Sequence, residues 1–70
     1  MSVTLRVQSH TFSGRHYATV IRCDSDAPIG ALSRQSRVSE SAALRGLGGL
    51  LADLHASAIR RADALEQEGR

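Results

Sequence analysis

Apolar residues after Ser39 recur at spacings of three, four and seven, and this pattern constrains the chain more than any other feature. They are Leu44, Leu47, Leu51, Leu54, Ala58 and Leu65. At about 100° per residue these positions fall on one side of an α-helix. Ser39 can cap the helix, Glu40 suits the positive end of its dipole, and Gly69 can end it. The pattern therefore predicts one helix over residues 39–67.

The beginning of the chain follows a period of two instead. Apolar residues alternate with polar ones, at Val3, Leu5 and Val7. Such alternation is typical of a strand with one buried face. Turn-forming residues follow, and Gly14 can adopt a positive φ. A run rich in β-branched and aromatic residues comes next. We expect two strands, 2–10 and 15–23, joined as a hairpin.

The segment between the hairpin and the helix leaves two readings open. Residues 24–28 form a clear loop. Residues 29–35 form either a short third strand or a turn of helix. The predicted fold class is α+β, with a small antiparallel sheet of two or three strands packed on one long C-terminal helix, in the order ββ(β)α. A chain of this length holds one core at most, so residues 1–70 are taken as a single domain.

The expected core joins the helix to the first strand. The helix residues expected to be buried against Val3, Leu5 and Val7 are Leu47, Leu51 and Leu54. The second strand carries apolar residues on both faces, so its orientation is the weaker inference. We take the residues that face the helix to be Tyr17, Thr19 and Ile21.

The residues that could carry chemistry do not form a recognisable pattern. His10, His16 and Cys23 could be regarded as metal ligands, but their spacing matches no zinc motif. No serine lies in a nucleophile elbow, and the glycines of residues 46–49 lie inside the helical pattern rather than after a strand. We expect no catalytic residue, no metal site and no cofactor, and therefore a binding module rather than an enzyme.

The sequence also indicates where the chain acts. No run approaches the roughly 20 apolar residues that span a bilayer. No basic segment followed by an apolar block opens the chain, so no signal peptide is expected. Cys23 is the only cysteine, which excludes an internal disulfide and is typical of a reducing compartment. We expect a cytoplasmic chain with no membrane partner.

One side of the helix is the first candidate binding surface. It lies opposite the leucines, and its members are Ala42, Gly46, Gly49, Asp53, Ala56 and Arg60. Each glycine costs up to about 1 kcal/mol inside a helix, and small residues let another backbone approach closely. A helix of about 40 Å also overhangs strands of about 27 Å. These features predict a protein partner, including a second copy in a homodimer.

The outer sheet face is the second candidate surface. The residues expected there are Arg6, His16, Arg22, Arg34 and Arg37. Arginine forks suit phosphates and base edges in a major groove. However, the formal net charge is only +2, and the chain holds one Tyr, one Phe and no Trp. Nucleic-acid binding is therefore the weaker alternative.

A resemblance to one DNA-binding family bears on this alternative. Residues 14–22, followed by residues 39–44, resemble a strand and the helix of plant AP2-type DNA-binding domains. The tryptophan expected on such a sheet is missing, so we do not assign the chain to that family.

The function expected from the sequence is non-catalytic. We expect a small module that acts by protein–protein interaction. Its size suggests the regulators or inhibitors by which phages and mobile elements act on a larger host protein complex. The alternative is a nucleic-acid-binding domain that uses its Arg-bearing sheet face.

Overall fold

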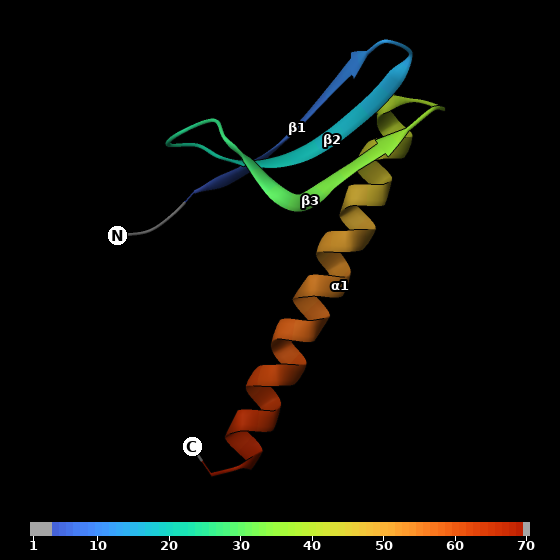
Figure 1. The fold of residues 1–70 in the computed structure, drawn as a ribbon. Helices are drawn as coiled ribbons and strands as arrows, with labels where there is room; N and C mark the ends of the chain where they lie inside the picture. Colours follow the sequence, from blue (N-terminus) through green and yellow to red (C-terminus); the bar gives the residue numbers. More distant parts are fainter. Residues whose placement is uncertain (1–3, 70) are drawn as a thin grey trace.

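The computed structural model describes residues 4–69 as a three-stranded antiparallel sheet followed by one long helix (Figure 1). The elements are β1 (Leu5–Phe12), β2 (Arg15–Arg22), β3 (Pro28–Ser36) and α1 (Glu40–Gln67). The strands lie in the order β1-β2-β3. This architecture confirms the predicted α+β class, and the ambiguous segment 29–35 belongs to a strand.

The hairpin of β1 and β2 is set by its two-residue turn. Ser13 has a φ of 51° and Gly14 a φ of 73°. Positive φ at both central positions is the hallmark of a type I′ turn, whose twist matches that of the flanking strands. Pairing consequently continues up to Phe12 opposite Arg15. The first strand therefore ends later than the predicted 2–10, because the turn occupies only Ser13 and Gly14.

β3 is a strand with an irregularity near its start. The pairing of β2 with β3 shifts register between Thr19 and Ile21. Thr19 pairs with Ser33 and Ile21 pairs with Pro28, so two residues along β2 correspond to five residues along β3. Gly30 lies within this stretch and has a φ of 35°. Extra residues in one strand bend it, and β3 bends visibly in its first half (Figure 1).

The core lies between the first half of α1 and the strands β2 and β3. Its buried residues are Ala18, Val20, Ala43 and Leu47, with Ile29, Leu32, Leu50 and Leu51 packed around them. Ala18 on β2 and Ala43 on α1 have short side chains, so the helix backbone can approach the sheet closely. Leu47, which is 1% exposed, fills the space beside them.

The predicted packing of the helix on the first strand is wrong. Leu5 and Val7 are each 49% exposed, and Leu54 is 45% exposed; Val3 lies outside the described residues. The helix crosses the sheet at β2 and β3, so β1 is the far edge strand. Leu51 is half-buried at the rim of the core.

The predicted orientation of the second strand is also wrong. Ala18 and Val20 face the helix, so Tyr17, Thr19 and Ile21 lie on the opposite face, since neighbours along a strand alternate. Both faces of β2 carry apolar residues, and Ile21 is buried as well. Which face of β2 is covered depends on the helix, and the helix packs against the face that carries the small side chain of Ala18.

The second half of α1 leaves the sheet and projects away from it (Figure 1). The helix has 28 residues and is therefore about 42 Å long. The radius of gyration is 15.2 Å, against about 11 Å for a compact chain of this length. An isolated helix of about four turns is marginally stable in water. This half is therefore supported by continuity with the packed half.

We expect Leu47→Ala to lower the free energy of unfolding by about 2–5 kcal/mol, through lost apolar burial and the cavity left behind. Leu54→Ala is the matched control on the exposed part of the same stripe, and it should cost less than about 1 kcal/mol. Urea unfolding followed by circular dichroism measures both. Equal losses in the two variants would show that the stripe is buried along its whole length in solution.

Candidate functional site

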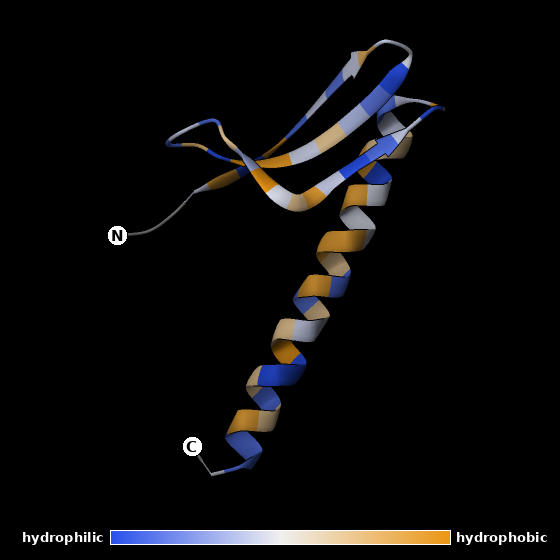
Figure 2. Ribbon diagram, in the orientation of Figure 1, coloured by the Kyte–Doolittle hydropathy of each residue, from blue (hydrophilic) through white to orange (hydrophobic). Residues whose placement is uncertain are grey.

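The exposed half of α1 carries an apolar stripe that the sheet does not cover. We call Leu54, Ala58 and Leu65 the projecting stripe. Its two leucines are 39–45% exposed, and Ile59, which is 49% exposed, lies on another side of the helix at 100° per residue. Figure 2 shows hydrophobic patches that continue down the helix well beyond the sheet. Arg61 interrupts them at the position between Ala58 and Leu65 where another apolar residue would complete the spacing.

The small-residue side of the helix is not one free surface. A Cβ placed on Gly46 would lie 3.7 Å from the Cβ and Cγ of Arg34, so Gly46 lies beside the stem of this β3 side chain. Around Gly49 there is open space. Farther along, the Arg60 guanidinium donates a hydrogen bond to Ser57 at 3.2 Å. The six residues predicted as an interface are therefore divided between a part against the sheet and a part in solvent.

The five basic residues predicted to share a sheet face do not do so. Arg6 lies on the face away from the helix, whereas His16 and Arg22 lie on the helix side by strand alternation. Arg34 packs its stem against the helix at Gly46, and Arg37 follows the end of β3. The prediction of one arginine surface fails because β2 has the opposite orientation.

A different set of side chains occupies the face away from the helix. We call it the outer sheet face. The strand register places these residues in rows across the sheet, namely Arg6, Gln8, His10, Arg15, Tyr17, Thr19, Ser33 and Gln35. Sequence reasoning overlooked most of them. One signal could have revealed the pairing of His10 with Tyr17, because these residues are equidistant from the two-residue turn.

The rings of His10 and Tyr17 stack across β1 and β2. Their centroids are 4.9 Å apart and their planes are inclined by 16°. This separation equals the usual spacing of neighbouring strands, about 4.8 Å, so the two rings stand upright on the sheet. Beyond them lies a hollow of about 300 Å³, lined by Tyr17, Thr19, Ser33, Arg34 and Gln35.

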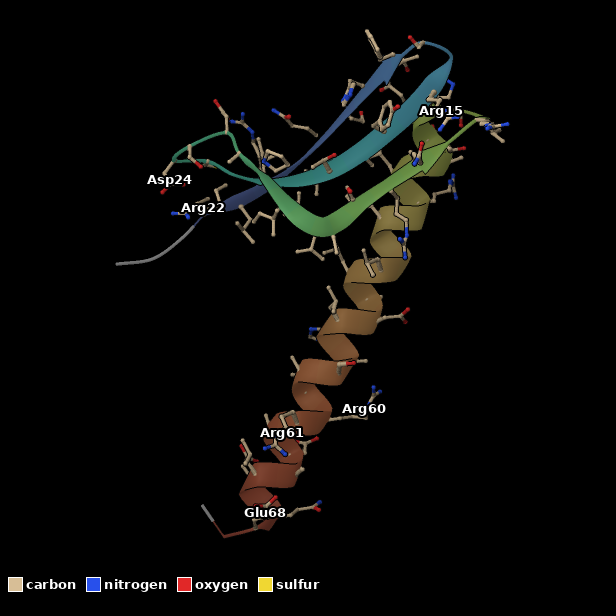
Figure 3. All side chains as sticks on the ribbon, viewed as in Figure 1. Arg15, Arg22, Asp24, Arg60, Arg61 and Glu68 are labelled. Atoms are coloured by element: carbon tan, nitrogen blue, oxygen red, sulfur yellow. The ribbon has the colours of Figure 1, made fainter. Side chains whose placement is uncertain are left out.

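Charges on the sheet are segregated. None of the three strands contains an Asp or Glu. Asp24 and Asp26 in the β2–β3 turn bind Arg22 at 2.7 Å and Arg6 at 2.6 Å. Both ion pairs are exposed, and such pairs contribute about 0–1 kcal/mol each. Figure 3 shows Arg15 and Arg22 at opposite ends of the sheet.

Glu40 ties the start of the helix to β1. Its carboxylate accepts hydrogen bonds from Ser9 Oγ at 2.9 Å and from Thr11 Oγ1 at 2.8 Å. The same Thr11 hydroxyl lies 2.7 Å from His16 Nδ1. In a nucleophilic triad the imidazole occupies the middle position, whereas here the hydroxyl does. The arrangement is therefore a structural link. The two hydroxyl donors lower the pKa of Glu40, and the nearby histidines lower it to a smaller extent.

Among residues 4–69, no three His, Cys, Asp or Glu side chains lie close enough together to hold a metal ion. Within the same range no helix is long and apolar enough to cross a membrane. His10 lies on the outer sheet face, His16 on the helix side, and Cys23 is exposed just after β2.

Comparison of the chain with protein-family models, with curated proteins and with solved structures found no match.

We expect Glu40→Gln to change how stability depends on pH. The folded-state pKa of Glu40 lies below its ordinary value of 4.5, so its contribution is present above that value. The contribution is lost as pH falls through the folded-state pKa. Unfolding curves between about pH 7 and pH 3 should show a smaller acid loss in the variant. Parallel curves, or an NMR titration midpoint of Glu40 at or above 4.5, would contradict this.

We expect Gly49→Ala to raise the free energy of unfolding by up to about 1 kcal/mol, because alanine favours a helix and the added methyl meets open space. Gly14→Ala is the control. Its Cβ also meets open space, but its φ is 73°, so it should lose about 1–2 kcal/mol. Thermal unfolding measures both. A loss of stability in Gly49→Ala would mean that this face packs against another chain.

Proposed function

We propose that this chain is a non-catalytic binding module that docks on a larger protein through the projecting half of α1. One observation carries the proposal: the helix continues past the sheet with Leu54 and Leu65 exposed on one side of it. Anchors on one face of a helix are the usual elements of helix-in-groove recognition.

The energetics of the free helix support this role. Burial of one large aliphatic side chain contributes about 1.5–3 kcal/mol, and the projecting stripe offers two such side chains. The sheet covers none of this stripe, so a partner would gain most of that area. Docking would also stabilise helical turns that are marginal alone. The stripe is thus suited to an apolar groove.

Arg61 indicates the chemistry of the groove. It lies within the stripe, and among residues 4–69 its guanidinium makes no salt bridge. A partner that covers the stripe must supply a carboxylate for it, since an unpaired buried charge is strongly unfavourable. We therefore propose a partner whose apolar groove carries an Asp or Glu facing Arg61.

A second copy of the chain fits this requirement less well. Self-pairing along the stripe would bring two Arg61 side chains into one apolar seam. Asp63 and Glu66 lie on other sides of the helix at 100° per residue, and Glu68, the acid on the side of Arg61, lies two turns farther on and not level with it. A homodimer therefore leaves the buried charges poorly compensated. This argument favours a different protein as the partner.

Occupying a groove on a larger protein is enough to regulate or inhibit it. A module of this size could act by blocking or reshaping a host protein complex, in the manner of phage and mobile-element regulators. The exposed, unpaired thiol of Cys23 suits a reducing compartment, and we place this action in the cytoplasm.

The test begins with a protein captured from the native host and purified, whose affinity for the chain is then titrated directly. Leu54→Asp and Arg61→Glu should each weaken binding by about tenfold or more, because each places a carboxylate on an apolar or acidic surface. Ala52→Asp introduces the same charge at an exposed position on the other side of α1 and should bind like the native chain.

Two outcomes would contradict the proposal. Unchanged affinity in Leu54→Asp would place the docking surface elsewhere. A concentration-dependent dimer in solution, abolished by Leu54→Asp but not by Ala52→Asp, would show that the stripe serves a second copy. Sedimentation equilibrium measures this second outcome without any partner.

A further inference from the structure

The outer sheet face has a feature that docking through the helix does not use. His10 and Tyr17 stand as a stacked pair, and the row they belong to continues on β3 with Gln35. One face of the Tyr17 ring meets His10. Tyr17 also lines the hollow of about 300 Å³ that adjoins β3. The hollow is therefore placed to accept a third planar group in the same stack.

Polar groups surround this place on its other sides. Thr19 and Ser33 contribute hydroxyls, and Gln35 contributes an amide. An amide presents a donor and an acceptor side by side, which suits the hydrogen-bonding edge of a nucleobase. Arg15 donates a hydrogen bond to the Gln35 side-chain oxygen at 3.2 Å and helps to orient it.

The charge of the sheet complements a phosphate backbone. None of the three strands carries a carboxylate, whereas Arg6 and Arg15 lie on this face. Arg6 is compensated by its ion pair with Asp26 at 2.6 Å, whereas Arg15 makes no salt bridge among residues 4–69. Arginine guanidinium groups bind phosphate oxygens well. An anionic ligand therefore meets attraction along the outer sheet face.

We propose that the outer sheet face binds single-stranded nucleic acid, with one base stacked on Tyr17 in the hollow and a neighbouring phosphate on Arg15. A single strand combines unstacked planar bases with regularly spaced negative charges. A duplex keeps its bases stacked inside, so it cannot place one in the hollow without unpairing it. This site is separate from the projecting stripe and goes beyond the protein-docking function.

Tyr17 makes the proposal directly measurable. It is the only Tyr, and the chain has no Trp, so the intrinsic fluorescence of the protein reports on this ring. The probes are an oligouridylate and an oligoadenylate of about ten nucleotides, a DNA duplex of equal charge, and inorganic polyphosphate. Both single strands should quench Tyr17. Polyphosphate, which has charge but no bases, should not.

Variants separate stacking from charge. Tyr17→Leu should lower affinity for the labelled single strands by roughly 5- to 100-fold, the range of one base–aromatic stack. Tyr17→Phe keeps a ring and should bind like the native chain. Arg15→Gln should make the salt slope shallower by about 0.7, the value for one phosphate contact on a single strand. Arg60→Gln removes the same charge from α1 and should leave the slope unchanged.

Three results would overturn the proposal. The first is no binding of either single strand at low salt. The second is quenching by polyphosphate or by the duplex equal to that by the single strands, which would indicate a general anion surface. The third is native affinity in Tyr17→Leu. Circular dichroism confirms that each variant is folded, and His10→Ala provides a second way to weaken the stack if Tyr17→Leu unfolds.

Discussion

The contact of Ala43 and Leu47 with Ala18 and Val20 is the interaction on which the rest of the structure depends. The four side chains are small or medium-sized, and the buried part of the domain is correspondingly small. Alanine on both sides brings the helix close to β2, and Leu47 fills the remaining space. Other links, such as Glu40 with the β1 hydroxyls, are surface hydrogen bonds that align the elements. Their net contributions are modest compared with burial of a whole leucine.

This one contact also decides which surfaces stay free. When Ala18 and Val20 turn toward the helix, Tyr17 and Thr19 must turn outward, because successive residues of a strand face opposite sides. The same contact involves only the first turns of α1, so the later turns project beyond the sheet (Figure 1). The outer sheet face and the projecting stripe are therefore two consequences of the same packing, and occupation of one leaves the other accessible.

The two surfaces differ in the physical basis of recognition. The projecting stripe offers aliphatic area around one cation, and its helix half also carries Asp53, Asp63 and Glu66. Those acids repel a phosphate backbone. The sheet has no strand carboxylate and offers rings, an amide and arginines instead. The division of charge thus separates an apolar protein contact on the helix from an anion contact on the sheet.

Local patterns in the sequence determined the helix from its Ser39 cap, a hairpin turn that includes Gly14, and the apolar turns of the helix beyond the sheet. Periodicity and turn chemistry depend on neighbouring residues, so they can be recognised in one dimension. The tertiary structure alone decided which face of β2 is buried, since both faces are apolar and the choice depends on the shape of the helix that packs there. The strand register places His10, Tyr17 and Gln35 in one row, and the burial of Ala18 and Val20 decides that this row faces away from the helix. The tertiary structure also placed Gly46 beside the stem of Arg34, because close approach is decided by the partner strand and not by the helical pattern.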